Sequence, residues 1–230
     1  MSFEQIKVIA FDADDTLWVN EPFFRNAEAE FCELLSAYMS AKEVDEVMYE
    51  VVLQNLPLYG YGIKPFILSL IEAAIKITGG NINASLIEKL IAKGKEMLQA
   101  PVDLLEGIEQ TLEYLSGSYR LVVATKGDLL DQERKLIKSG LEKYFHHTEI
   151  VSDKTELQYK KLVKHLDIEP HQFLMIGNSL KSDVLPVLNI GAHAVHIPFH
   201  TTWIHEMVDE EVHHPNFRTC TSANELRELL

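Results

Sequence analysis

The pattern of apolar and polar positions divides the chain into three stretches. An apolar run over residues 6–11 opens it and ends in a cluster of carboxylates. From about residue 21 to residue 100, apolar residues recur every three or four positions, which is the period of an amphipathic helix. From residue 101 onward, short apolar runs alternate with helical patterns. The pattern predicts an α/β protein with an all-helical insertion.

The apolar runs of the first and third stretches predict a buried parallel sheet. Strands that are apolar throughout are typical of sheets covered by helices on both faces. The predicted strands are residues 6–11, 119–124, 148–151, 172–176 and 191–198, with a further edge strand at 217–219. The helical patterns between and after them cover residues 108–115, 130–141, 156–166 and 224–230.

The helical stretch is too long to be a crossover connection between two strands. We therefore expect it to form a separate small bundle over residues 20–100. The α/β core would then comprise residues 1–19 and 101–230. The two connections, near residues 19–21 and 100–102, are expected to act as hinges.

The end of the first strand carries the strongest chemical indication in the sequence. Asp12 and Asp14 follow it directly, and ligands of open α/β sheets bind beyond the carboxyl ends of the strands. In an extended chain, side chains two positions apart leave on the same side. Such a pair suits Mg²⁺, and a carboxylate can also attack phosphorus. The alternative is that these acids only begin a turn.

Composition and charge narrow the function classes. The chain has 230 residues, 47% of them hydrophobic, and a net charge of −14, which argues against nucleic acid and anionic membranes as partners. Cys32 and Cys220 are far apart and predict free thiols in a reducing compartment. We expect no signal peptide and no membrane span, and hence a cytoplasmic protein. The oligomeric state is left open.

The segment Asp12-Ala13-Asp14-Asp15-Thr16-Leu17 resembles the first motif of the haloacid dehalogenase-like (HAD) hydrolase superfamily. The resemblance implies that Asp12 is the nucleophile and Asp14 the general acid/base. It also implies a doubly wound, Rossmann-like sheet with strand order 3-2-1-4-5. The helical insertion would be a cap that closes over the active site.

Two further segments match the second and third motifs of that family, in the same order. An apolar strand ends at Thr125, whose hydroxyl would bind phosphate together with the neighbouring Lys126. Lys154 lies just before a predicted helix, where the family has a lysine that neutralises the nucleophile against phosphate. Three other lysines inside that helix are competitors, and a solvated helix face explains them better.

The fourth motif brings a departure from the family pattern. Gly177-Asn178 follows a strand, and Asp183 comes five positions after Asn178. The resemblance implies Mg²⁺ as cofactor, held by Asp12, Asp14, residue 178 and Asp183. The family usually has an aspartate where this chain has Asn178, and an amide oxygen can ligate a hard cation but adds no charge.

Two loops have open interpretations. In the helical stretch, Tyr59, Tyr61 and Lys64 could recognise the substrate, or the segment could be a connector between helices whose tyrosines only pack. Near the end of the chain, the histidine-containing segment 200–214 is expected to be a polar surface loop rather than a second metal site.

Taken together, the motifs predict a Mg²⁺-dependent phosphohydrolase that cleaves a small phosphomonoester through an aspartyl phosphate. Asp14 argues against dehalogenases, which lack a carboxylate there, and against phosphonatases. A phosphomutase with the same two aspartates stays open. So do a non-enzymatic phospho-acceptor, which would lack a cap, and a degenerate ligand-binding member of the family.

Overall fold

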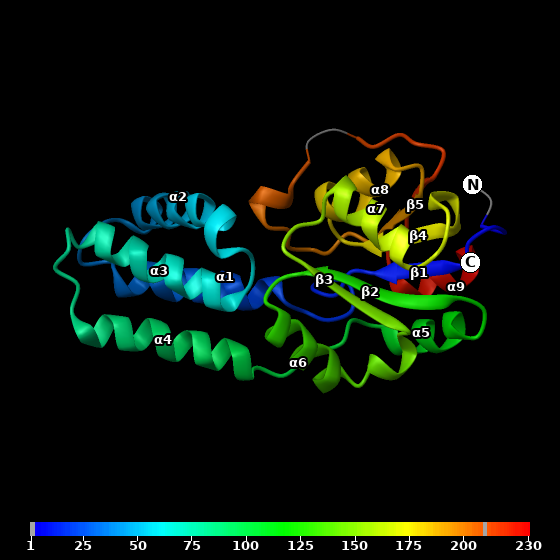
Figure 1. Cartoon of the computed structure of the whole chain (residues 1–230). Coiled ribbons are helices and arrows are strands. Elements are labelled where there is room, and N and C mark those ends of the chain that lie inside the picture. Colours follow the sequence, from blue (N-terminus) through cyan, green and yellow to red (C-terminus); the bar gives the residue numbers. More distant parts are fainter. Residues whose placement is uncertain (1–2, 209–210) are drawn as a thin grey trace. The chain divides into compact units, whose positions relative to one another are not determined.

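The computed structural model describes residues 3–208 and 211–230 (Figure 1). The chain forms two compact units. The first consists of residues 1–21, 102–126 and 132–230, and the second of residues 22–101 and 127–131. The first unit has two apolar cores, and the second has one of its own.

The first unit is built on a parallel sheet of six strands in the order β3-β2-β1-β4-β5-β6. The strands are β1 (Val8–Phe11), β2 (Arg120–Lys126), β3 (His147–Val151), β4 (Phe173–Gly177), β5 (His193–His196) and β6 (Phe217–Thr219). The predicted fold class and strand order are confirmed, and β6 adds a parallel edge strand.

The first strand begins two residues later than the apolar run. Val8 is in register with Arg120 of β2 and Phe173 of β4, and these are the first residues of both neighbours. Ladder pairing of the central strand thus starts where its two partners start. Apolar character alone does not set this boundary, because Ile6 is also buried.

Alternate residues of β1 serve two separate cores. Ile9 and Phe11 pack with α5 (Ile108–Ser116), α6 (Leu129–Ser139) and α9 (Leu226–Leu229), and Val8 and Ala10 pack with α7 (Glu156–His165) and α8 (Leu185–Asn189). Figure 1 shows these two groups of helices on opposite faces of the sheet. This covering of both faces explains why the central strands β1 and β4 are buried along their whole length and contain no polar side chain.

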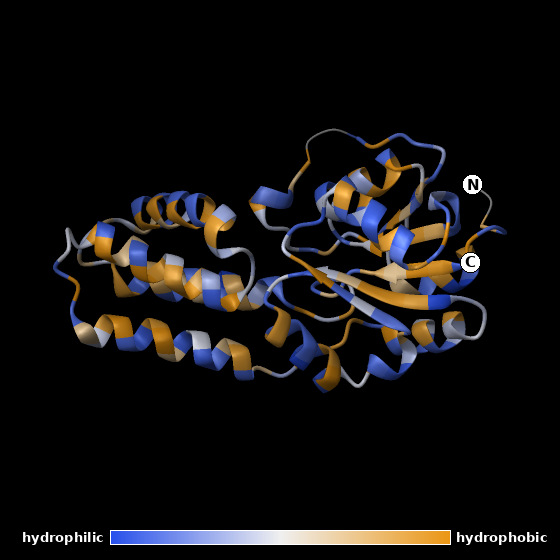
Figure 2. Cartoon of the chain, viewed as in Figure 1, coloured by the Kyte–Doolittle hydropathy of each residue, from blue (hydrophilic) through white to orange (hydrophobic). Residues whose placement is uncertain are grey.

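The second unit contains four helices. They are α1 (Glu21–Leu34), α2 (Ala41–Tyr59), α3 (Ile63–Ile77) and α4 (Ala84–Gln99). Ser40 and Glu43 form a capping box at the start of α2, and the Asn83 side chain caps α4. Figure 2 shows the helices with alternating hydrophobic and hydrophilic positions, as expected when one face of each is buried.

The short segment that follows β2 belongs to the helical unit rather than to the α/β unit. Residues 127–131 follow β2 directly, where the sequence predicts continuous core. The ammonium group of Lys64 lies 2.8 Å from Oδ1 of Asp128, and the backbone of Gly62 packs against Asp128. The φ angle of Gly62 is +113°, which favours glycine at this contact.

Within the described ranges 3–208 and 211–230, no helix is both long and apolar enough to cross a membrane. Cys32 is half-buried, Cys220 is buried, and both are free.

Candidate active site

The carboxyl ends of β1, β2 and β4 bring the predicted motifs together. Asp12 follows β1, Thr125 and Lys126 end β2, and Asn178 follows β4. Since β1 lies between β2 and β4, its end is flanked by the other two. This is the usual ligand position of an open parallel sheet.

Lys154 is the cation at the centre of the site. Its Nζ lies 2.5 Å from Oδ1 of Asp12 and 2.6 Å from Oδ1 of Asp183. The Lys154 side chain is only 3% exposed, whereas Lys160, inside α7, pairs with Glu156 at the surface. Thr155 caps α7 directly after Lys154, which places the lysine at the loop that leads into the helix.

The electrostatics of this cluster are unbalanced. Burial raises the pKa of Asp12 to about 7, in spite of Lys154, and Asp183 adds to the rise. Burial by itself would lower the pKa of Lys154, but Asp12 and Asp183 outweigh it and raise that pKa. One ammonium group therefore serves two buried carboxyl groups, and the site is short of positive charge.

Asp183 is held in place by a π-helical turn, η3 (Leu180–Val184), that follows β4. The backbone N–H of Ser179 donates to Oδ2 of Asp183 at 3.0 Å. A Cβ atom on Gly177 would lie 2.2 Å from that same oxygen, so only glycine fits at the end of β4. The sequence does not predict the π-helical turn.

Asn178 lies against the first motif. With its amide nitrogen turned inward, it donates to Oδ2 of Asp12 at 3.1 Å and to the main-chain oxygen of Asp14 at 3.2 Å. In the opposite orientation its Oδ1 accepts from the Thr16 hydroxyl at 3.2 Å. Depending on its orientation, the Asn178 amide therefore turns either an N–H donor or an oxygen toward the first motif.

These residues fit a hard divalent cation. Within the described part of the chain, no three His, Cys, Asp or Glu side chains are grouped to hold a metal. The donor set is instead a carboxylate of Asp12, the carbonyl of Asp14 and the amide of Asn178, all of which supply oxygen. Oxygen ligands and unbalanced negative charge are what Mg²⁺ requires.

Asp14 has partners different from those of Asp12. Trp18 Nε1 donates to its Oδ1 at 2.7 Å, Lys135 Nζ lies 2.6 Å from the same oxygen, and Gln132 Nε2 donates to its Oδ2 at 3.0 Å. The strand ends at Phe11, before both aspartates. The sequence pattern does not indicate that Trp18, Gln132 or Lys135 belongs to the site.

Gln132 connects the first motif to the second. Its Nε2 lies 3.0 Å from Oδ2 of Asp14 and 3.1 Å from the hydroxyl oxygen of Thr125. Both Gln132 and Thr125 are buried, at 4% and 2% exposure. The helical period of α6 would have shown which of its residues share a face, but not that this face meets Asp14.

The third acid of the cluster has a structural role. Asp15 has a φ angle of +59°, and its carboxylate accepts hydrogen bonds from the backbone N–H groups of Asn20 and Glu21. Burial raises the pKa of Asp15 to about 7, against the effect of these two hydrogen bonds. Asp15 thereby anchors the chain where it leaves the α/β unit.

The segment 200–214 does not behave as a surface loop throughout. The Glu206 side chain is 10% exposed, and its Oε1 lies 2.5 Å from Nζ of Lys126. The hydroxyls of Ser179 and Ser182 both donate to its Oε2 at 2.5 Å. Burial opposes the charge on Glu206, but Lys126 and these hydrogen bonds outweigh it and lower the pKa of Glu206 to about 2.

Tyr59, Tyr61 and Lys64, which are predicted to recognise the substrate, lie at the connection between α2 and α3. The Tyr59 hydroxyl donates to Oε1 of Glu72 at 2.6 Å, and Lys64 pairs with Asp128. Tyr61 lies between Gly60 and Gly62 and is half-buried. The contacts of Tyr59 with Glu72 and of Lys64 with Asp128 lie within the helical unit. Recognition of a substrate by these residues stays a prediction.

Known proteins resemble this chain over most of its length. A family model of haloacid dehalogenase-like hydrolases matches residues 6–191. The chain belongs to this family. The predicted resemblance is confirmed.

Two curated relatives and a solved structure are similar over most of the chain. N-acylneuraminate-9-phosphatase from Homo sapiens is 25% identical, over 90% of this chain and 85% of that protein. Glyceraldehyde 3-phosphate phosphatase from Pyrococcus furiosus is 25% identical, over 83% and 80%. A haloacid dehalogenase-like family hydrolase from Xanthomonas campestris is 36% identical, with a TM-score of 0.88, over 98% and 90%. The prediction that the chain is an enzyme of the phosphatase class is confirmed.

Proposed function

We propose that this protein hydrolyses a small phosphomonoester through an aspartyl phosphate on Asp12, with Mg²⁺ as cofactor. The observation that supports this best is the buried lysine shared by Asp12 and Asp183. A lysine within 2.5 Å of a carboxylate reduces the repulsion between that carboxylate and an incoming phosphate. Such a charge arrangement serves a nucleophile better than it serves a structural turn.

The proposed reaction has two steps. An oxygen of Asp12 attacks phosphorus, the bond from phosphorus to the substrate's alcohol oxygen breaks, and Asp14 gives its proton to that oxygen. Asp14 then takes a proton from water as the water oxygen attacks phosphorus, and the bond to Asp12 breaks. Alcohol and inorganic phosphate leave. Thr125 and Lys154 would hold the phosphoryl oxygens, and Lys126 would assist.

Mg²⁺ would be held by Asp12, the carbonyl of Asp14 and Asn178, with Asp183 nearby. When bound, the cation supplies positive charge to a phosphoryl group. Lys154 carries one positive charge against the two carboxyl groups of Asp12 and Asp183, which supports a requirement for a cation.

The helical unit is the proposed cap, and its connections to the α/β unit are the proposed hinges. Residues 20–100 would form this cap, with 1–19 and 101–230 as the core domain. We propose a small phosphorylated compound as substrate, in keeping with the names of the two phosphatase relatives. A cytoplasmic location remains part of this proposal.

A screen of phosphomonoesters tests the proposed function. Each compound is incubated with the protein in Mg²⁺ and, separately, in EDTA, and released phosphate is measured. We expect at least one compound to be hydrolysed in Mg²⁺ and the activity to be lost in EDTA. No hydrolysis of any phosphomonoester in Mg²⁺ would contradict the proposal.

A further inference from the structure

The carboxylate of Glu206 connects the two strands that flank β1. Phe11 is in register with one residue of β2 and one of β4, and Lys126 and Ser179 each lie three residues beyond those partners. Glu206 contacts both Lys126 and Ser179. Since β1 lies between these strands, the contacts of Glu206 bridge the carboxyl end of β1, which Asp12 follows.

The contacts of Glu206 are those of a bound oxyanion. Lys126 donates to one carboxylate oxygen, and the hydroxyls of Ser179 and Ser182 donate to the other. Lys126 Nζ also donates to the Ser182 hydroxyl at 2.9 Å, so the donors are linked to one another. One cation and two hydroxyls are a donor set suited to carboxylate or phosphate oxygens.

These donors belong to the strand ends and not to the segment that carries Glu206. Lys126 is the last residue of β2, and both serines follow β4, with side chains in a buried turn. The Ser179 hydroxyl also accepts from the backbone N–H of Ser182 at 3.0 Å, which fixes the two serines together. The donor set is therefore assembled by the sheet.

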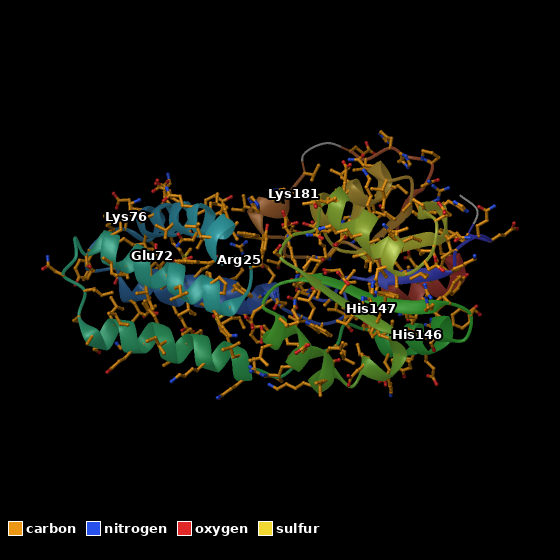
Figure 3. All side chains as sticks on the ribbon, viewed as in Figure 1. Arg25, Glu72, Lys76, His146, His147 and Lys181 are labelled. Atoms are coloured by element: carbon orange, nitrogen blue, oxygen red, sulfur yellow. The ribbon has the colours of Figure 1, made fainter. Side chains whose placement is uncertain are left out.

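Polar contacts hold the segment of Glu206. It belongs to a short turn, η4 (Ile204–Glu206), in which Ile204 is 60% exposed, and the following Met207 is 59% exposed. Lys181, which is labelled in Figure 3, donates from its Nζ to the carbonyl oxygen of His205 at 2.8 Å. Because the Ile204 and Met207 side chains are exposed, releasing them gives up little apolar burial, and a competing anion can replace the charge contacts of Glu206.

We propose that Lys126, Ser179 and Ser182 form a binding site for the oxyanion group of a ligand, and that Glu206 occupies this site as a tethered competitor. The ligand group is a phosphoryl or a carboxylate oxyanion. A site that its own chain fills most of the time binds a free ligand more weakly, in proportion to the fraction of molecules in which it is open. Binding at this site does not require hydrolysis, so the proposal goes beyond the proposed function.

Anion binding to four proteins tests this inference. Inorganic phosphate and acetate are titrated separately into the wild type, Glu206→Ala, Glu206→Gln and Glu211→Gln, all in EDTA to weaken binding at the cation-dependent site. Binding is followed by calorimetry and by the rise in melting temperature. Glu211 is the control, because its side chain is 84% exposed in the same connection.

We expect the half-saturating concentration of at least one anion to fall about tenfold or more in Glu206→Ala, as it would if Glu206 fills the site in more than about nine molecules in ten. Glu206→Gln, which keeps the size of the side chain and loses its charge, should shift in the same direction by less. Glu211→Gln should bind as the wild type does. If Glu206→Ala does not fold, the shift in Glu206→Gln decides.

The gain must depend on Lys126. Adding Lys126→Met to Glu206→Ala should return the half-saturating concentration to the wild-type value or above. A gain with phosphate assigns the site to phosphoryl groups, and a gain with acetate assigns it to carboxylates. No gain with either anion, or a gain that survives Lys126→Met, would overturn the proposal. Anion binding without any phosphomonoester hydrolysis would contradict the proposed function alone.

Discussion

The ammonium group of Lys135 lies 2.6 Å from Oδ1 of Asp14, the residue that we propose as general acid/base. Both side chains are largely buried, at 16% and 25% exposure. Trp18 and Gln132 complete a set of three donors around this carboxylate. Asp14 is therefore oriented by groups from its own turn and from α6.

The first prediction is that Lys135 acts through Asp14. A hydrogen bond to a charged group contributes about 1.5–3 kcal/mol, so Lys135→Met should lower kcat about tenfold or more and leave KM nearly unchanged. Asp14→Asn should lower kcat about 10²–10⁴-fold. The double variant should be little worse than Asp14→Asn, because residues that act as a unit are not additive.

Steady-state kinetics of the four proteins measures this coupling. Lys138→Met is the matched control, since Lys138 lies on the same helix and is exposed. Losses that simply multiply in the double variant would mean that Lys135 and Asp14 act independently.

The second prediction concerns the nucleophile. Asp12→Asn removes the attacking carboxylate but keeps its shape, and its amide oxygen can still accept a hydrogen bond from Lys154. Turnover of any phosphomonoester substrate should be abolished, while circular dichroism shows a folded protein. Substantial turnover in a preparation free of contaminating phosphatase would mean that Asp12 is not the nucleophile.

The third prediction is a pH dependence that Mg²⁺ shifts. Asp12 must be ionised to attack, and in the cation-free protein its pKa is raised to about 7. At low Mg²⁺, kcat/KM should therefore rise as the pH rises through about 7. A bound cation favours the ionised carboxylate, so higher Mg²⁺ should move this rise to lower pH.

The pH profile is measured at two Mg²⁺ concentrations with ionic strength held constant. Asp15, whose pKa burial also raises to about 7, is separated by Asp15→Asn, in which the Mg²⁺-dependent shift should persist. A profile that is the same at both Mg²⁺ concentrations would show that the cation and the proton do not compete at Asp12.

The fourth prediction rests on Asn178. Its amide faces Oδ2 of Asp12 and the carbonyl of Asp14, so a carboxylate at this position would add charge beside both oxygens. Asn178→Asp should therefore need less Mg²⁺ for half-activation than the wild type does. Turnover at saturating Mg²⁺ does not test this ligand, because the added charge also repels an anionic substrate. An equal or weaker apparent affinity for Mg²⁺ would show that residue 178 is not a ligand.

The fifth prediction concerns the helical unit. If Tyr59, Tyr61 and Lys64 read the substrate, then Tyr59→Phe, Tyr61→Phe and Lys64→Met should change the order in which phosphomonoesters are preferred, with no change in Mg²⁺ activation. Lys76→Met is the control, because Lys76 pairs with Glu50 elsewhere in the unit. An unchanged order of substrates would favour the packed connector.

The sequence alone determined the sheet and its strand ends. An apolar run that ends in polar residues is a local pattern, and the carboxyl ends of parallel strands converge, so Asp12 and Thr125 could be placed at one edge. The strand order and the motif positions of Lys154 and Asp183 came from the family resemblance. The local pattern could not set the start of β1, because that depends on where two other strands begin.

Only the tertiary structure decided which side chains surround these residues. Gln132 and Lys135 are 118 and 121 positions from Asp14 in the chain, and Glu206 is 80 positions from Lys126. Periodicity shows which face of a helix is polar but not which carboxylate that face meets. Glu206 also follows no strand and belongs to no motif, so its burial against Lys126 depends on how a long connection packs, a long-range contact that no local pattern encodes.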